Sequence, residues 1–139
     1  MNRKVIIIGP AFPYRGGIAN FNNSLAVEYK KLGADVKIYS FSLQYPSILF
    51  PGKTQYEKGN PPQDIDIEHI INSINPFNWF NVARKIKKEN PDYVIIRYWL
   101  PFMAPSLGTI AKFINKKIKI FAITDNIIPH EKRFGDDIL

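Results

Sequence analysis

The chain has 139 residues, enough for one domain with a hydrophobic core, and its 45% hydrophobic and 14% aromatic content excludes wholesale disorder. It contains no cysteine, which excludes disulfide scaffolds, thiolate catalysis and zinc sites built from thiolates. Its 19 Lys and Arg exceed its 12 Asp and Glu, which gives a net charge of +7. Such an excess favours anionic partners, although a basic solvated surface would produce the same balance.

The first half of the chain alternates short apolar runs with one helical pattern. Lys4–Gly9 contains four consecutive Val and Ile residues, which predict a strand buried on both faces. A glycine pair follows, and apolar residues then recur at helical spacing until Gly33: Ile18, Phe21, Leu25, Tyr29 and Leu32. Asp35–Ser42 and the weaker run Asp66–Ile71 predict the second and third strands.

The second half continues this alternation. Pro76 opens a helix that the segment Asn90–Asp92 ends, and Tyr93–Tyr98 predicts a central, apolar fourth strand. Pro105 begins another helix, and Ile118–Thr124 predicts the fifth strand. Strands that alternate with helices of this length imply right-handed crossovers. The predicted fold class is therefore α/β: a single Rossmann-like domain with a doubly wound, mainly parallel sheet of at least five strands.

Two segments lack periodicity, and no segment has the length of a membrane span. Leu43–Asp64 is a long loop with proline, glycine and aromatic residues, and loops of that length are usually functional or mobile. Asp125–Leu139 stops without a helix terminator, as though the chain had been cut at the start of a helix. Val5–Ile8 is too short for a signal peptide, and Val94–Leu107 is interrupted by an arginine and two prolines. A cytoplasmic location is expected.

Ligands of open parallel sheets bind beyond the carboxyl ends of the strands, so the loops there carry the candidate site residues. The first loop, Gly9–Gly17, has neither the spacing of a dinucleotide fingerprint nor the ending of a P-loop. Its Gly16-Gly17 pair at the start of a helix, with Arg15 beside it, favours contact with a phosphate or a sugar. The alternative is a plain turn that needs glycine for its backbone angles.

The last loop carries polar groups directly after the fifth strand. Asp125 could accept hydrogen bonds from hydroxyls, and His130 and Glu131 could bind polar groups or relay protons near neutral pH. The alternative is an Asx-turn at Asp125-Asn126, with His130 on the surface. A metal site is not expected, because His69 belongs to a predicted strand away from His130 and no other ligand types cluster.

Basic residues cluster on two predicted helices, with aromatic residues nearby in the sequence. The clusters are Arg84–Lys88 and Lys112–Lys119, and the aromatic residues are Phe77, Trp79, Phe80, Trp99 and Phe102. Most of these aromatic residues are expected in the core, but exposed ones beside lysines would indicate contact with an anionic membrane surface. The basic residues form no continuous stripe, so a nucleic-acid partner is not expected.

These features resemble the N-terminal, acceptor-side domain of family-four GT-B retaining glycosyltransferases, especially the bacterial enzymes of cell-surface polysaccharide biosynthesis. The resemblance covers essentially the whole chain. It rests on the order and spacing of four segments: Val5–Pro10, Arg15–Ala19, Tyr39–Pro46 and Asp125–Glu131. No single segment is diagnostic, and the resemblance depends on the four together.

The resemblance implies a transferase that moves a sugar from a nucleotide-sugar donor to a cell-surface glycan or lipid-linked acceptor, with retention and without a metal or other cofactor. It places Arg15, Gly16 and Gly17 against the phosphates or sugar of the donor. Many members have a histidine directly after the fifth strand. This chain has Asp125 there, so the catalytic role falls to Asp125 or His130. Acceptor contacts are expected from four residues: Tyr98, Trp99, Asn126 and Glu131.

The resemblance also implies a missing half. Residues 1–139 would form the N-terminal domain, and the C-terminal donor-binding domain is absent from this chain, so the isolated chain is expected to be inactive. The alternative from another class is a non-catalytic basic α/β binding or regulatory module. A sugar-nucleotide epimerase, which shares the two-domain architecture, is a third hypothesis. A second domain encoded after Leu139 would favour an enzyme, whereas a stop codon there would favour the module.

Overall fold

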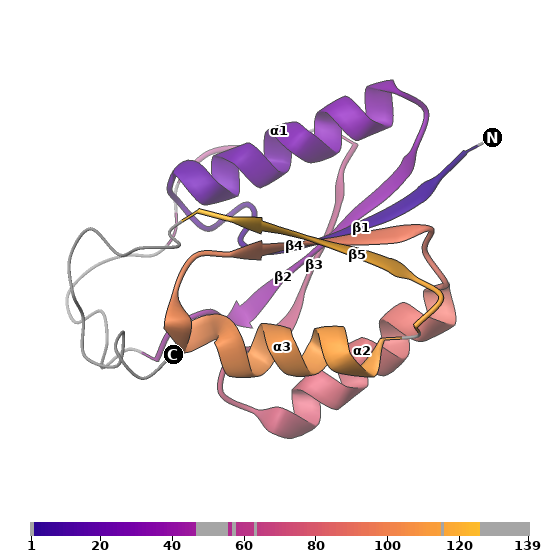
Figure 1. Ribbon diagram of the computed structural model, residues 1–139. Coiled ribbons are helices and arrows are strands. Elements are labelled where there is room, and N and C mark those ends of the chain that lie inside the picture. Colours follow the sequence, from indigo (N-terminus) through magenta and orange to yellow (C-terminus); the bar gives the residue numbers. More distant parts are fainter. Residues whose placement is uncertain (1, 47–55, 57, 63, 115, 126–139) are drawn as a thin grey trace.

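The computed structural model describes residues 2–46, 56, 58–62, 64–114 and 116–125, and its strands form one parallel sheet (Figure 1). The five strands, in the order β3-β2-β1-β4-β5 across the sheet, are β1 (Lys4–Ile8), β2 (Asp35–Leu43), β3 (Asp66–Asn72), β4 (Tyr93–Tyr98) and β5 (Lys119–Thr124). The prediction of an α/β domain with a parallel, Rossmann-like sheet is therefore confirmed.

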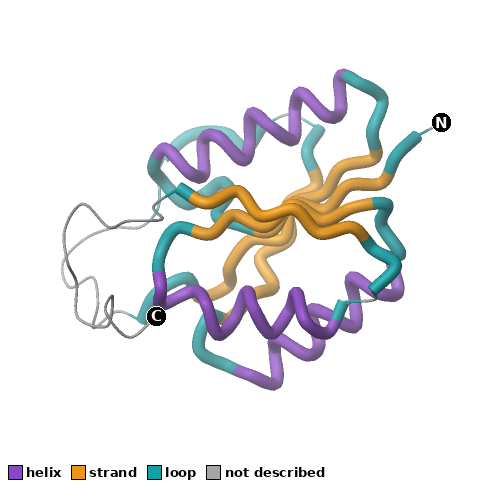
Figure 2. The backbone as a smooth tube through the Cα atoms, viewed as in Figure 1, coloured by secondary structure: helices purple, strands orange, loops and turns teal. Residues whose placement is uncertain are grey.

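The helices cover the sheet from both sides, which makes it doubly wound. α1 (Gly17–Lys31) lies on one face, and α2 (Pro76–Glu89) and α3 (Ala104–Phe113) lie on the other (Figure 1, Figure 2). A short 3₁₀ helix, η2 (Pro101–Met103), leads into α3. Every helix and strand predicted from the sequence is present, and its ends agree with the expected ones to within a residue or two.

β1 lies at the centre of the core, because its apolar run supplies buried side chains to both faces of the sheet. Val5, Ile6, Ile7 and Ile8 are all fully buried. Ile6 and Ile8 pack with side chains of α2 and α3, whereas Val5 and Ile7 pack with Ala26 of α1. Successive residues of a strand point to opposite faces, so an uninterrupted aliphatic run fits a strand that is covered twice.

Both ends of α2 are fixed by local chemistry. Asn75 caps its start, because the side-chain Oδ1 accepts hydrogen bonds from the amides two and three residues later, at 3.1 and 3.4 Å. Asn90 ends the helix in the left-handed conformation, with a φ of 48°. Pro91 then prevents continuation of the helix. As the sequence predicts, β4 begins at Tyr93.

The strand order reverses at β1. From β1 the chain moves to β2 and β3 on one side, and it then returns to place β4 and β5 on the other. Open α/β sheets bind their ligands in the crevice outside the carboxyl ends of the strands at such a reversal. In Figure 1 the arrowheads of β4 and β5 and the start of α1 lie at this same edge of the sheet. The carboxyl edge near β1 and β4 is therefore the expected position of a ligand.

A cluster of charged side chains joins β2, β3 and α2. Lys37 Nζ lies 3.4 Å from a carboxylate oxygen of Asp66, 3.4 Å from one of Glu68 and 3.8 Å from one of Glu89. Lys85 Nζ lies 2.6 Å from the other carboxylate oxygen of Glu68. The hydrogen bond from Lys85, supported by the positive charges of both lysines, holds the pKa of the Glu68 carboxyl below its usual value.

We expect Glu68→Gln to lower the free energy of unfolding by about 0.5 kcal/mol near pH 7 and by less near pH 3. A carboxyl with a lowered folded-state pKa stabilises the fold above its unfolded pKa of about 4.3, and this stabilisation is lost as the pH falls through the folded value. Urea unfolding at both pH values measures the two effects. Glu28→Gln, which breaks an exposed pair with Lys31, is the control and should change little. An equal loss at both pH values would contradict the assignment.

Candidate functional site

Arg97 and Asp125 meet at the carboxyl edge of the sheet. Arg97 is the penultimate residue of β4, and Asp125 follows the end of β5. Arg97 Nη2 donates a hydrogen bond to Asp125 Oδ1 within an ion pair. The backbone N of Asp125 donates to Tyr98 O at 3.0 Å. The pair therefore joins the ends of β4 and β5 beside the point where the strand order reverses.

The Arg97 guanidinium is buried although it carries a charge. Its side chain is 4% exposed, whereas that of Asp125 is 27% exposed. Its Cζ lies 4.5 Å from the centre of the Phe21 ring on α1, which is an attractive cation–π contact. Its Nε has no hydrogen-bond partner among the described residues. Because a guanidinium has five N–H donors, Arg97 retains capacity for an acceptor beyond Asp125.

Gly9 allows the end of β1 to approach Arg97 closely. A Cβ atom at Gly9 would lie 2.7 Å from Asn22 Nδ2 and 3.0 Å from Arg97 Cβ. Asn22 is fully buried on α1, and its Nδ2 donates to Pro10 O at 2.8 Å. Its Oδ1 has no partner within the part of the chain that the structure describes. Glycine is therefore required at this position by the close packing of its neighbours. The backbone angles of Gly9 do not by themselves require glycine.

Two side chains attach the loop between β1 and α1 to its neighbours. Ser40 Oγ on β2 accepts a hydrogen bond from Ala11 N at 3.1 Å. Asn23 Oδ1 on α1 accepts one from Phe12 N at 3.3 Å. Both acceptors satisfy backbone amides that the sheet and the helix leave unpaired. The loop is thereby held against β2 and α1, which fixes the place where α1 begins.

The amino end of α1 is open. Gly16 has a φ of 118°, which favours glycine, and Gly17 is the first helical residue. Among the described residues, no atom beyond the adjoining residues and the backbone of the helix lies within 4 Å of a Cβ built at either glycine. No described side chain caps the helix, and no acidic residue stands in its first turn. Unpaired amides and the positive end of the helix dipole therefore favour an anion here. Arg15, the preceding residue, is exposed.

The predicted acceptor residues Tyr98 and Trp99 contribute to the core at this edge. Trp99 is 5% exposed, and its Nε1 donates to Tyr45 OH at 2.6 Å. Its ring meets that of Phe41 edge-on, with ring centres 6.0 Å apart. Tyr98 is half-buried against the same cluster. Tyr45 also lies beside Phe102, with ring centres 6.1 Å apart. Trp99 thus joins the end of β4 to the segment that follows β2.

The structure places the predicted site residues in two groups and adds one that the sequence did not reveal. Arg15 and the glycine pair lie at the start of α1, whereas Tyr98, Trp99 and Asp125 lie at the ends of β4 and β5. Three predicted residues are outside the described part of the chain: Asn126, His130 and Glu131. Arg97 was not among the predicted site residues, because in the sequence it stands out only as an interruption of the apolar region Val94–Leu107. The available signal was a lone charge near the end of a central strand.

Metal ligands do not cluster in the residues that the structure describes. These residues contain no group of three or more His, Cys, Asp or Glu side chains that could hold a metal ion. His69 lies on β3, where its Nε2 is 2.7 Å from Phe12 O and its ring centre is 6.3 Å from that of Tyr14. No helix within the described ranges has both the length and the apolar character that a membrane span requires.

Comparison with known proteins leaves the function open. No family model and no curated protein sequence matches the chain. A solved structure that it resembles is the C-terminal domain of a hydrogenase from Pyrococcus furiosus. The two share 11% sequence identity over 88% of this chain and 94% of that one, with a TM-score of 0.45. The function therefore has to be inferred from the residues of the site.

Proposed function

We propose that this chain is the acceptor-side half of a retaining GT-B glycosyltransferase, which transfers a sugar from a nucleotide-sugar donor to a cell-surface glycan or lipid-linked acceptor. The observation that carries the proposal is the open amino end of α1. There, Gly16 and Gly17 leave backbone amides accessible to the phosphates of the donor. Arg97 lies at the same edge of the sheet, where Asp125 pairs with its charge and its Nε has no partner among the described residues.

Asp125 positions a sugar in this proposal. Its Oδ1 accepts the hydrogen bond from Arg97, yet its side chain remains 27% exposed. Its Oδ2 is therefore the oxygen that would accept a hydrogen bond from a hydroxyl of the donor or the acceptor. Because the same carboxylate also holds Arg97, we assign Asp125 to positioning and leave proton transfer to His130, the other predicted catalytic residue.

Titration of the chain with nucleoside diphosphates and nucleotide sugars tests the phosphate site. We expect the backbone amide NMR signals of Gly16, Gly17 and Ile18 to shift on binding. Gly17→Glu is expected to weaken binding at least about tenfold, because a carboxylate in the first turn competes with the phosphates for the helix dipole. Gly17→Gln has nearly the same shape without the charge and should weaken binding much less.

Two outcomes would count against this site. Equal weakening by the Glu and Gln variants would mean that the side chain blocks the surface sterically, without an effect of charge. Amide signals at the start of α1 that no nucleotide shifts would favour the alternative function, a non-catalytic basic binding or regulatory module. Neither outcome depends on turnover, so both can be read from the 139-residue chain.

Turnover requires the rest of the enzyme. A second domain supplies most of the positioning and phosphate stabilisation in such a cleft, so the 139-residue chain should bind nucleotide without transferring sugar. A full-length protein assayed against a panel of nucleotide sugars would identify the donor. Detectable transfer by the isolated chain would contradict the proposal that two domains are needed.

We also propose that the outer face of α2 and α3 attaches to an anionic membrane surface. Phe80 and Phe113 form a partly exposed pair with ring centres 4.7 Å apart, and Phe77 is 81% exposed at the start of α2. Lys112 Nζ lies 5.8 Å from the centre of the Phe113 ring. Arg84 is exposed one turn after Phe80. Exposed rings beside cations suit the interface of a bilayer that contains anionic lipids.

Co-sedimentation with lipid vesicles tests this attachment. Binding is expected with vesicles that contain anionic lipid at low salt, and it should weaken at high salt or with neutral vesicles. Phe77→Ser should reduce the binding about tenfold, because it removes one ring from the interface. Phe121→Ser on β5 removes a ring that is 53% exposed on the opposite face, and it is the control. Equal binding to both vesicle types, or an equal loss in the control, would rule this surface out.

A further inference from the structure

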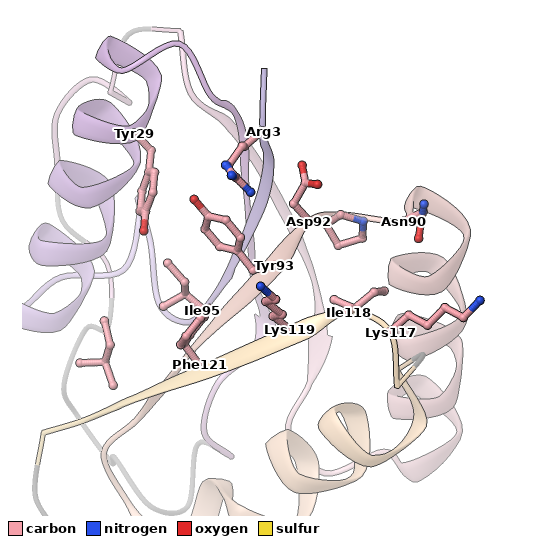
Figure 3. Close-up of a pocket in the computed structure, with 12 residues that line it drawn as sticks. Arg3, Tyr29, Asn90, Asp92, Tyr93, Ile95, Lys117, Ile118, Lys119 and Phe121 are labelled. Carbon is pink, nitrogen blue, oxygen red and sulfur yellow. The ribbon is translucent and has the colours of Figure 1, made fainter. Parts of the chain in front are cut away.

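The face of the sheet that carries α1 is uncovered over β4 and β5 in the described part of the chain. The other two long helices lie on the opposite face (Figure 1). The register of the two strands pairs Tyr93 with Lys119 and Ile95 with Phe121. These four residues and Tyr29 of α1 line one hollow, where the ring of Tyr93 lies next to that of Tyr29 (Figure 3). Ile95 is buried, whereas Tyr93 is half-buried and Phe121 is exposed. The accessible apolar strip next to α1 therefore consists of these two rings, with Lys119 at one end.

A hollow of about 820 Å³ lies over this strip and reaches the amino ends of the strands (Figure 3). Three aromatic rings line it, those of Tyr29, Tyr93 and Phe121. The rings lie next to one another, because the centre of the Tyr93 ring lies 6.2 Å from that of Tyr29 and 5.9 Å from that of Phe121. Phe121 is 53% exposed, although parallel sheets ordinarily have apolar cover on both faces. The strip therefore offers apolar surface that an apolar partner would bury.

The rim of the hollow is basic. Arg3, Lys117 and Lys119 all line it. Asp92 also lines it and contributes one negative charge, because the hydrogen bond that its Oδ2 accepts comes from the neutral backbone N of Lys4, at 2.7 Å. The three cations exceed this single carboxylate, so the lining has a net positive charge. A complementary partner must therefore bring carboxylates. A second copy of this chain, with its net charge of +7, would bring further cations to the rim and is disfavoured.

We infer that this surface binds an amphipathic helix of a separate acidic protein, apolar along one side and flanked by Asp or Glu. The six residues of β4 rise about 20 Å, which a helix of about 13 residues would span. The apolar side of the helix packs on Tyr93 and Phe121, above the buried Ile95, and its carboxylates meet Arg3 and Lys119. The inference does not rest on the proposed sugar transfer, because the basic rim lies at the amino ends of the strands and the proposed phosphate site lies at their carboxyl edge.

Two synthetic helices of about 14 residues test the inference on the 139-residue chain. Both carry leucine at i, i+3, i+4 and i+7 spacing, and they differ in having either glutamate or lysine at the flanking positions. The glutamate peptide is expected to bind at least about tenfold more tightly, with NMR shifts centred on Tyr93, Ile95 and Phe121. Absence of binding, or shifts centred elsewhere, would overturn the inference.

Charge reversal at the rim distinguishes binding of the peptide to this surface from general attraction of an acidic peptide to a basic protein. Arg3→Glu/Lys119→Glu should abolish the preference for the glutamate peptide. Arg84→Glu/Lys88→Glu makes the same change of net charge at exposed positions of α2 and should leave the preference intact. Equal loss in both variants would overturn the inference, as would a dimer that is detected by sedimentation and dissociates in the Phe121→Ser variant. If the rim variant does not fold, Phe121→Ser replaces it, and unchanged affinity in that variant would be contrary to the inference.

Discussion

Replacing Gly9 by alanine is expected to lower the free energy of unfolding by about 2 kcal/mol. The added methyl would lie 2.7 Å from Asn22 Nδ2 and 3.0 Å from Arg97 Cβ, closer than van der Waals contact allows. Neither neighbour can move away easily. Asn22 is fully buried and hydrogen-bonded to Pro10 O, and the contacted atom of Arg97 is attached directly to its backbone. Urea unfolding of the variant and the parent chain measures the difference.

Gly108 provides a control of opposite sign. It lies within α3, and among the described residues no atom beyond its neighbours and the backbone of α3 falls within 4 Å of a Cβ built there. Alanine is a better helix former than glycine, so Gly108→Ala is expected to raise the free energy of unfolding by about 0.5 to 1 kcal/mol. If both alanine variants changed the stability in the same direction, the close packing assigned to Gly9 would be wrong.

Asp125→Ala is expected to lower the free energy of unfolding by about 3 kcal/mol, a larger loss than that caused by Arg97→Met. The alanine variant leaves a guanidinium that is 4% exposed without its counter-charge. The methionine variant instead leaves a carboxylate that is 27% exposed and can be hydrated. Methionine also fills part of the arginine volume beside Phe21. The more buried member of the pair therefore determines which variant is the less stable.

A double-mutant cycle measures how strongly the two charges are coupled. The variant that lacks both Arg97 and Asp125 should lose less stability than the sum of the two single losses. Asp125→Asn keeps an acceptor oxygen without the charge and should fall between the parent chain and Asp125→Ala. Equal single losses together with strict additivity would mean that the charges do not interact.

Most of the fold could be predicted because its signals are local. The segment Asn90–Asp92 and the apolar run after it predict a strand over Tyr93–Tyr98, and the structure has a strand with the same bounds. Pro76 predicts the start of a helix, and α2 begins at that residue after a capping asparagine. Each signal lies within a few residues of the helix or strand that it delimits, so neighbouring residues suffice to interpret it.

The site could be predicted only in part because its contacts are long-range. Arg97 and Asp125 are 28 residues apart, and Trp99 and Tyr45 are 54 residues apart. Such pairs depend on strand order and on the face to which each side chain points, and no local pattern specifies either. The glycine pair could be identified because the start of a helix is a local signal. Asn22 could not, because a buried asparagine on a helix has the same sequence signature as an exposed one.

The aliphatic run of β1 supplies apolar surface but cannot fix its own register. All residues from Val5 to Ile8 are aliphatic, so a shift of one position along β2 and β4 would still present apolar side chains to both faces. Gly9 removes this degeneracy. It ends the run at the point where a Cβ atom would clash with Asn22 and Arg97, so a strand displaced in either direction would bring a larger residue against them. A residue without a side chain therefore sets the alignment of the central strand, and with it the alignment of the strands on either side.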